Sequence, residues 1–495
     1  MSTVRTVVLH GLTGHLLTLT ATRADGPRPT LTITGRARSD GGELRDRVRA
    51  ALATSTPRRR DSCVEVALDP PESEPGAAAV AVAVLAATSR VPARRLARTA
   101  VLGELEHDGT LSTTPGMLPA LQSARAHGIR RVIVPAAALT QAALVTGIEA
   151  LGARTLAEVA AWLTGDDTAL RHPAAPAPPV SDDLLPPTRA LAAPLSRAVE
   201  VAAAGGHHLL VESLDSAGTL PAARWLHHLV PDLTPDQQLE LAAIRSLIGS
   251  REDAAVLVST PPLVTVHPSG STASLIGGAL PGAVSRAHRG VLVAPELDQF
   301  PGSLLARLRA VLRYRAVLLV RGGHPLRYPA GCQLFATCTR TPGTRSTLPP
   351  ELLDALDIRL TPAPGHPATI RNPRTDEAHQ VERALAHARA RVATARTRAA
   401  DRWREATPPD STREVTNAAV PADALHELTL PTRVTAPLRR AREAGALTRH
   451  GFDTVLRLAW TATDLDGNDR PERHHVEQAL ALRQATPDSP HRTTC

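Results

Sequence analysis

Apolar and polar positions follow two different periods over residues 1–165, which predicts a mixture of strands and helices. β-rich segments between Gly and Pro turns predict strands at Val4–His10, Leu16–Ala21, Leu31–Thr34, Cys63–Leu68 and Arg131–Val134. Apolar residues at helical spacing predict helices at Gly42–Thr54, Ala77–Ser89, Leu118–His127 and Thr155–Leu163. Val101–Leu111 is expected to form a hairpin that turns at Asp108-Gly109. The pattern indicates an α/β sandwich over this region.

A Pro-rich segment, residues 166–190, is expected to be an extended linker. Over residues 191–365, helices alternate with short apolar strands, predicted at Leu209–Glu212, Val256–Val258, Val291–Val293, Val317–Val320 and Gln333–Thr337. Such alternation favours a largely parallel, doubly wound sheet. Residues 375–485 are helical in pattern, with helices expected at Glu377–Glu405, Pro421–Leu428, Pro437–Ala444, Thr448–Leu465 and Arg473–Arg483. Residues 486–495 are expected to be a disordered tail.

The chain contains no lysine, so all 56 basic side chains are arginine. A phosphate-binding loop uses a lysine ammonium as a point charge between phosphates, and a Ser–Lys dyad or Schiff base needs an amine that loses its proton. These reaction classes are therefore excluded. We interpret the arginine excess as the mark of a GC-rich genome. The formal charge of +8 permits attraction to nucleic acid, but 48 acidic residues offset most of the basic ones.

Cysteine usage and apolar runs bear on the cell compartment. The four cysteines are scattered without a CxxC pair, which argues against a disulfide framework or a zinc knuckle. The start of the chain lacks the apolar region of a signal peptide. The longest apolar run, residues 76–87, is too short to span a bilayer. We therefore expect a cytoplasmic protein without membrane contact.

Several strings occur in an order that resembles the magnesium-chelatase-like AAA+ family of the ComM/YifB type. They include LHGLTGHLL, VLGELEHDGTL, GMLPALQSAR, AVEVAAAGGHHLL, LTPDQQLELAAIRSLIG, SRAHRGVLVAPELDQF, TVLRLAWTATDLDG and RPERHHVEQALALR. The resemblance implies an α/β and α+β multidomain architecture. Residues 1–165 would form a Lon-protease-like domain with ribosomal S5 domain 2 topology, residues 191–365 an AAA+ core, and residues 375–485 a helical lid. The family implies ATP and Mg²⁺ as ligands.

The residues that carry the family's phosphate chemistry are replaced. The family's GPPGSGKT loop falls on SLDSAGTL, in which Ser213, Ser216, Gly218 and Thr219 are the vestigial positions and Thr219 stands where the lysine should be. The second nucleotide motif keeps Glu296, but its metal-orienting aspartate is Pro295. Phosphoryl transfer depends on positioning and charge neutralisation, so these losses remove most of its basis.

Three further family positions bear on nucleotide chemistry. The sensor-1 asparagine is replaced by Thr339, and the arginine of the family's LLDRID by Ala355, whereas Arg457 remains in the sensor-2 region. We predict no catalytic residue and no bound cofactor, so enzymatic activity stays doubtful. The Lon-type Ser–Lys dyad is also excluded, because the chain has no lysine.

The histidine pairs and the tryptophans are interpreted as structural, and the Arg-rich helix as either a solvated surface or a DNA contact. The pairs His207-His208, His227-His228 and His474-His475 place adjacent side chains about 100° apart on a helix, so no metal site is predicted. The four tryptophans fall in apolar helical registers and are expected in the core. The Arg-rich helix alternates with acids, but it is the tentative DNA contact, through Arg383, Arg389, Arg391, Arg396 and Arg398.

Three hypotheses for function follow from the resemblance. The first is a pseudo-ATPase that keeps an oligomerisation or DNA-processing role in recombination or transformation, as a homo-hexamer or as a hetero-hexamer with an active relative. The second is an active ATP-dependent DNA branch-migration motor with an unorthodox nucleotide loop. The third is a decaying paralogue that merely folds. The sequence does not separate the first from the third.

Overall fold

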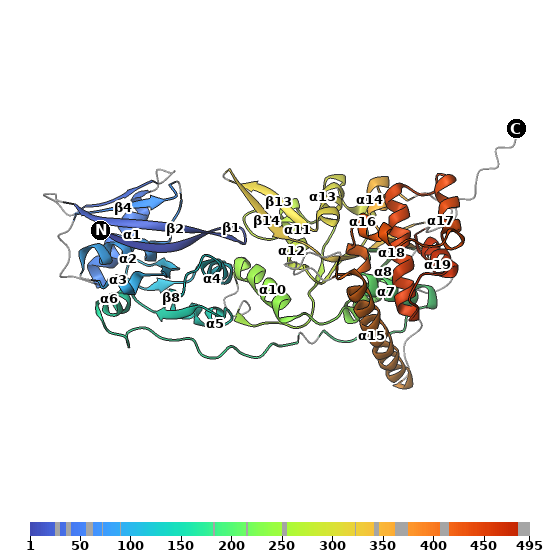
Figure 1. Cartoon of the computed structure of the whole chain (residues 1–495), viewed down its shortest axis with the longest axis horizontal. Helices are drawn as coiled ribbons and strands as arrows, with labels where there is room; N and C mark the ends of the chain where they lie inside the picture. Colours follow the sequence, from blue (N-terminus) through green and yellow to red (C-terminus); the bar gives the residue numbers. More distant parts are fainter. Residues whose placement is uncertain are drawn as a thin grey trace. The chain divides into compact units, whose positions relative to one another are not determined.

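A computed structural model describes residues 1–24, 30–35, 41–55, 63–71, 73–89, 91–181, 184–213, 216–249, 255–321, 323–340, 346–361, 375–405 and 415–483. The predicted tail, 486–495, lies outside these residues. The chain is a mixed α/β protein that divides into two compact units (Figure 1). Unit 1 consists of Met1–Val180, Gln238–Val258 and Leu318–Tyr328, and unit 2 of Ser181–Gln237, Ser259–Val317 and Pro329–Cys495. In the described part of the chain, every helix is too short or too polar to cross a bilayer.

Unit 1 is built on a seven-stranded mixed sheet in the order β3-β4-β2-β1-β5-β8-β9. Its strands are β1 (Ser2–His10), β2 (Thr13–Ala24), β3 (Leu31–Thr34), β4 (Cys63–Asp69), β5 (Thr99–Val101), β8 (Arg131–Pro135) and β9 (Glu149–Ala153). β1 and β2 pair antiparallel along their length, whereas β5, β8 and β9 are parallel. The predicted hairpin is shorter than expected: β6 (Glu104–Leu105) pairs with β7 (Leu111–Ser112), and β5 joins the main sheet.

Helices cover both faces of this sheet. They are α1 (Gly41–Ser55), α2 (Ala77–Thr88), α3 (Ala93–Leu96), α4 (Met117–Ala126), α5 (Leu139–Ala142) and α6 (Leu156–Thr164). In β8, Ile133 joins the core formed with α1, α2 and α6, while Val132 and Val134 join the core formed with α4. This alternation is the period of two that strands impose. Ten consecutive residues of α2 are buried, as in a helix that is apolar all round.

Two segments from later in the chain belong to unit 1. In α10 (Pro235–Ile248), Ala242 and Ala243 enter the core beside α4, and the Ser246 carbonyl accepts a hydrogen bond from the Gly116 N–H (2.7 Å). The second segment is most of a hairpin of β13 (Ala316–Arg321) and β14 (His324–Pro329). Its buried Tyr328 packs closely on Gly11, whose φ of +66° favours glycine and whose added Cβ would lie 3.2 Å from the ring.

The prediction that Val317–Val320 belongs to the parallel sheet is wrong. β13 pairs with β14 in a separate two-stranded sheet, because only a short turn separates the two strands and a parallel neighbour would need a long crossover. The prediction of a strand at Val256–Val258 is also wrong. That segment forms only an isolated bridge between Val258 and Val180, and the strand lies at β11 instead.

Unit 2 contains a five-stranded parallel sheet in the order β11-β12-β15-β10-β16. Its strands are β10 (Leu209–Ser213), β11 (Leu263–Thr265), β12 (Val291–Ala294), β15 (Gln333–Thr339) and β16 (Ile358–Leu360). β10, β12 and β15 confirm the predicted strands. The described residues of 166–190 contain neither a helix nor a strand, and Arg171 and Val180 form isolated bridges.

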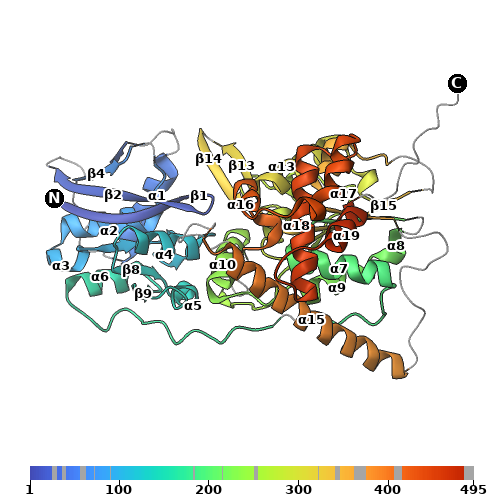
Figure 2. The same ribbon diagram turned by 45° about the vertical axis from the view of Figure 1, so that its right-hand side comes forward.

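The remaining helices belong to unit 2. They are α7 (Ala193–Gly205), α8 (Ser216–Thr219), α9 (Pro221–Leu229), α11 (Thr272–Ile276), α12 (Ala283–Arg286), α13 (Gly302–Tyr314), α14 (Pro350–Ala355), α15 (Thr375–Trp403), α16 (Ala422–Glu427), α17 (Thr432–Glu443), α18 (Arg449–Asp466) and α19 (Arg473–Arg483). α15 packs on α7 and α18 (Figure 2). The helix predicted at Pro437–Ala444 begins earlier, at Thr432, and contains Pro437 in its interior.

Candidate nucleotide-binding site

The vestigial nucleotide positions begin where two parallel strands end. Ser213, the last residue of β10, lies opposite Thr339, the last residue of β15, and the Arg340 N–H donates to the Ser213 carbonyl (3.1 Å). Ligands of open α/β sheets bind at this carboxyl end of the strands. The structure therefore brings together the loop position and the sensor-1 position that the sequence predicted.

The position expected to hold lysine is closed off. Ser216, Gly218 and Thr219 lie in the short helix α8, and the side chain of Thr219 is fully buried. A lysine ammonium at this position would have to extend toward a phosphate, whereas the Thr219 hydroxyl is short, uncharged and covered.

A buried carboxylate stands at the same strand end. Glu212 in β10 is fully buried, and its Oε2 accepts a hydrogen bond from Arg340 Nη1 at 2.9 Å, with Arg359 Nη2 at 3.9 Å. Burial, together with Asp298 and Glu212, raises the pKa of Cys338 to about 12. Sequence reasoning missed this cluster, although a glutamate within the apolar run LLVES was its visible signal.

Glu296 lies in a left-handed backbone conformation, with φ +50°. Its N–H donates to Thr337 Oγ1 (3.1 Å), and its side chain is exposed. The neighbouring Asp298 accepts a hydrogen bond from the Thr339 N–H (3.3 Å). Glu296 is therefore near the sensor-1 position, but the residue before it is Pro295, which has no group that could orient a metal ion.

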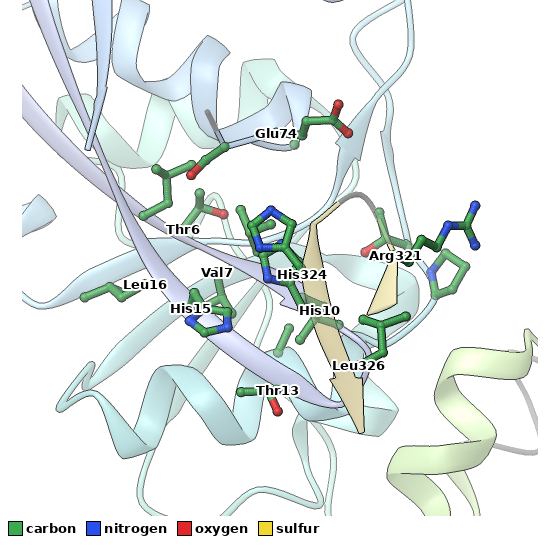
Figure 3. Close-up of a pocket in the computed structure, with 18 of the residues that line it drawn as sticks. Thr6, Val7, His10, Thr13, His15, Leu16, Glu74, Arg321, His324 and Leu326 are labelled. Carbon is green, nitrogen blue, oxygen red and sulfur yellow. The ribbon is translucent and has the colours of Figure 1, made fainter. Parts of the chain in front are cut away.

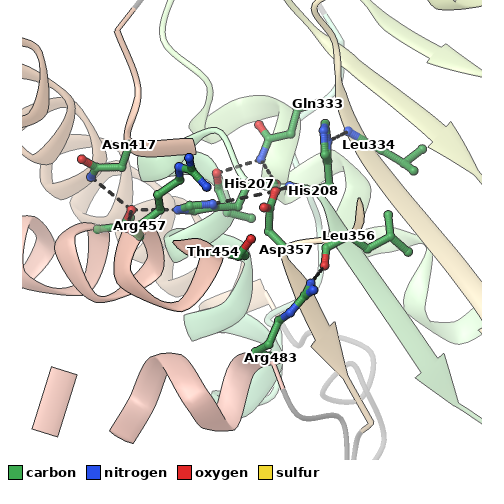
Figure 4. A network of polar contacts seen from close by, with 12 residues as sticks. His207, His208, Gln333, Leu334, Leu356, Asp357, Asn417, Thr454, Arg457 and Arg483 are labelled. Carbon is green, nitrogen blue, oxygen red and sulfur yellow. Dashed lines mark hydrogen bonds and ion pairs between the residues drawn. The ribbon is translucent and has the colours of Figure 1, made fainter. Parts of the chain in front are cut away.

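Arg457 lies at the other end of the sheet. Its guanidinium donates to the Val420 carbonyl through Nε (3.1 Å) and Nη2 (2.9 Å). It lies beside His207 and Asp357, which precede β10 and β16 (Figure 4). Ser213 is the C-terminal residue of β10, so the structure does not bring Arg457 together with the vestigial loop.

The residues around Arg457 form an internal polar network (Figure 4). Asp357 accepts a hydrogen bond from the His208 N–H (2.8 Å), and His207 Nε2 contacts Thr461 Oγ1 at 2.8 Å. Burial lowers the pKa of His207 to about 4. Burial alone would raise the pKa of Asp357, but the nearby His207 and His208 lower it below its ordinary value. This network connects the start of the sheet to α18.

The arginines predicted to contact DNA are mostly engaged within the protein. Arg391 pairs with Glu200, and Arg398 Nη2 contacts Asp469 (2.9 Å) and the Asn468 carbonyl. Arg396 is buried, and its guanidinium donates to the Ala203 carbonyl at 2.9 and 2.7 Å. Arg389 and Arg383 are exposed, and Arg389 pairs with Asp232 (2.9 Å). Much of the Arg-rich pattern thus serves helix packing.

The histidine pairs were also predicted to be structural. Asp466, His474 and His475 each place one potential ligand atom within 4.8 Å of the other two. However, His475 Nδ1 accepts a hydrogen bond from the Glu472 N–H (2.9 Å), so Nε2 carries the proton of the neutral ring and faces Asp466 Oδ2 at 3.3 Å. A metal-bound histidine instead donates through its second nitrogen. The geometry therefore favours an Asp–His contact. All four tryptophans are buried, as predicted.

The described residues at this site do not fit Mg²⁺–ATP. Thr219, which the resemblance aligns with the lysine, is buried; Pro295 falls at the aligned metal-orienting position; and a buried carboxylate, Glu212, lies near the end of β10. Phosphate binding needs converging donors and positive charge, whereas the Arg340 guanidinium at this strand end is paired with Glu212.

Three family descriptions match the chain. "Subunit ChlI of Mg-chelatase" matches residues 21–138, "Magnesium chelatase, subunit ChlI" residues 192–351, and its C-terminal part residues 382–483. The chain belongs to the magnesium-chelatase-like AAA+ family of the ComM/YifB type.

Curated relatives agree with this assignment. An uncharacterised protein of Mycobacterium tuberculosis strain H37Rv is 34% identical over 97% of both chains. YifB of Escherichia coli is 32% identical over 63% of each chain. The competence protein ComM of Haemophilus influenzae is 26% identical over 67% of each.

Proposed function

We propose that this protein is a pseudo-ATPase of the ComM/YifB type, which acts as an assembly subunit rather than as a motor. The observation that carries the proposal is the full burial of Thr219 at the position where the family resemblance places a phosphate-binding lysine. Glu212 adds a negative charge at the same strand end, where a polyphosphate would need positive charge. The chain contains no lysine that could compensate.

The finer domain assignment is part of this proposal. Residues 1–165 would be the Lon-like domain, residues 191–365 the AAA+ core and residues 375–485 the helical lid. The mixed sheet of unit 1, the parallel sheet of unit 2 and the helices α15–α19 support these assignments. The extensive buried apolar cores of both units support a subunit that keeps its shape for assembly with itself or with an active relative.

Calorimetry with Mg²⁺–ATP tests the loss of nucleotide binding. We expect no saturable heat for the wild-type chain. A Thr219→Lys variant should also give no saturable heat, because one ammonium group neither replaces the missing metal ligand nor removes the Glu212 carboxylate. Saturable binding of ATP by the wild-type chain, with a dissociation constant below about 10 μM, would contradict the proposal and favour the motor hypothesis. This threshold corresponds to a binding free energy of about 7 kcal/mol.

Assembly is tested separately by measuring the molar mass in solution. The chain is expected to form an oligomer alone or when mixed with an intact ComM/YifB protein. A monomer under both conditions would refute the assembly role and favour the decaying paralogue. A DNA role through α15 stays a prediction. Its arginine–phosphate contacts should need no ATP and should weaken steeply with salt.

A further inference from the structure

The hairpin of β13 and β14 lies in a stretch of chain without acidic residues. From Gln299 to Pro350 the sequence contains eight arginines and neither Asp nor Glu. Two of these arginines, Arg321 and Arg327, are exposed on the hairpin. The hairpin therefore presents a basic surface that residues within this stretch do not neutralise.

This hairpin borders a cleft of about 1570 Å³ within unit 1. Residues of β1 and β2 form another wall, and Glu74, from the segment before α2, also lines the cleft (Figure 3). The rings of His10 and His324 stack with centroids 4.0 Å apart, which holds the hairpin against β1. The volume exceeds that of an ordinary small-molecule site, so a larger ligand fits it better.

The cleft is bordered by strand edges. β1 pairs with β2 over Ser2–His10, but among the described pairings it meets β5 only at Arg5 with Ala100. Beyond Arg5, the second edge of β1 therefore borders the cleft, and Thr6–His10 line it. Within the part of the chain that the structure describes, the hairpin is a two-stranded sheet, so each of its strands also has an edge without a strand partner. Such edges accept an added extended strand through main-chain hydrogen bonds.

Aliphatic side chains are exposed at the same place. Leu318 is 63% exposed and Val320 is 78% exposed, and both line the cleft. They are two residues apart in β13, so they point to the same face of the strand. Exposed apolar residues gathered in a groove indicate a binding surface.

The charges of the lining indicate which side chains a ligand would carry. Arg321 and Arg327 supply positive charge on the hairpin side. Of the two lining glutamates, Glu104 accepts a hydrogen bond from the Ala77 N–H (3.1 Å) and lies 3.7 Å from Arg47. The second, Glu74, belongs to the segment before α2 and not to the hairpin. Acidic groups of a ligand would therefore lie beside the hairpin.

We propose that this cleft binds an extended peptide segment of another protein, alternating aliphatic and acidic residues, by β-strand addition. Its main chain would pair with a strand edge, its aliphatic side chains would cover Leu318 and Val320, and its carboxylates would meet Arg321 and Arg327. A single nucleic acid strand fits less well, because bases stack on aromatic faces and the exposed side chains in β13 are aliphatic.

Fluorescence anisotropy with the full-length chain tests this proposal. The probe is a labelled nonapeptide that alternates valine and glutamate. Matched probes replace glutamate by lysine, or place proline at alternate positions to remove amide donors. A labelled oligo-dT serves as the nucleic acid probe. We expect saturable binding of the glutamate peptide below about 100 μM, and much weaker binding of the lysine and proline peptides.

Variants locate the binding surface. The double variant Leu318→Ala/Val320→Ala should weaken binding of the glutamate peptide by at least about tenfold, because both side chains lose apolar contact. Leu185→Ala, at a residue that is 76% exposed outside the cleft, should leave binding unchanged. Arg321→Glu/Arg327→Glu should reverse the preference, so that the lysine peptide binds better than the glutamate peptide. Circular dichroism should show that all variants remain folded.

Three results would overturn the proposal. The first is no saturable binding of the glutamate peptide. The second is equal binding by the wild type and by Leu318→Ala/Val320→Ala. The third is binding of oligo-dT, but not of peptide, that is lost in Arg321→Glu/Arg327→Glu, which would identify a nucleic acid surface.

Discussion

Arg340 and Glu212 form a buried ion pair at the carboxyl end of the parallel sheet, with Nη1 and Oε2 2.9 Å apart. Glu212 lies in β10 and Arg340 follows β15, so the pair joins two neighbouring strands at the position where the family resemblance predicts a nucleotide. An internal carboxylate thus neutralises an arginine at this strand end.

Removal of one partner should leave the other charge buried and unpaired. Glu212→Ala is expected to lower the free energy of unfolding by about 3–5 kcal/mol, since breaking a buried pair costs more than the pair itself contributes. Urea denaturation of the purified variant measures this loss. Glu296→Ala, at an exposed residue, is the control and should change stability by less than about 0.5 kcal/mol. Equal losses for both variants would show that the Glu212 pair has no special role.

His207 should make the stability of the protein depend on pH. Burial lowers its folded-state pKa to about 4, below the ordinary histidine value of 6.5, so the folded state binds fewer protons than the unfolded state. Stability is therefore complete above pH 6.5 and decreases as the pH falls toward 4, by up to about 3 kcal/mol. Urea denaturation across this range should show a smaller decrease for His207→Gln than for the wild type. His107→Gln, at an exposed residue, should retain the wild-type pH dependence.

The buried thiols should be chemically inert in the folded protein. Burial raises the pKa of Cys332 to about 11 and that of Cys338 to about 12, so few thiolates form at pH 8. In a Cys495→Ser background, titration with a thiol reagent should detect one rapidly reacting group, Cys63, which is partly exposed. In guanidinium chloride, all three remaining thiols should react. Rapid native reaction of two or more thiols would contradict the described burial.

Arg396 and Arg383, both in α15, should contribute differently to the stability of the fold. Arg396→Ala removes two hydrogen bonds to the Ala203 carbonyl in the interior and should destabilise the fold by about 1.5–3 kcal/mol. Arg383→Ala, at an exposed residue, should change stability by less than about 0.5 kcal/mol. Urea denaturation measures both effects. Comparable stability of the two variants would mean that Arg396 does not hold α15 in place.

The same helix allows a test of the DNA hypothesis. If α15 binds phosphate, the double variant Arg383→Ala/Arg389→Ala should weaken binding of duplex and junction DNA at about 50 mM salt and reduce the salt dependence of the affinity. Asp232→Ala, which removes the partner of Arg389, should not weaken binding. Unchanged affinity and salt dependence in the double variant would exclude this helix as the DNA contact.

The sequence by itself excluded chemistry that requires a lysine ammonium, and it determined most of the helix and strand ranges. The lack of lysine excludes an ammonium at Thr219 in any fold. The helix at Arg473–Arg483 and the strand at β10 follow the predicted ranges closely, because the period of apolar residues reports which face of an element is buried.

Only the tertiary structure decided which neighbour covers each face. The arginine pattern of α15 did not distinguish Arg396, buried against α7, from Arg383, exposed to solvent, because helical spacing does not identify the element that packs on it. For the same reason, the apolar pattern of Val317–Val320 predicts a strand of the parallel sheet, whereas β13 pairs only with β14 among the described strands. The pairing of Glu212 with Arg340, 128 residues apart in sequence, arises where two strand ends meet, and no local pattern encodes such a contact.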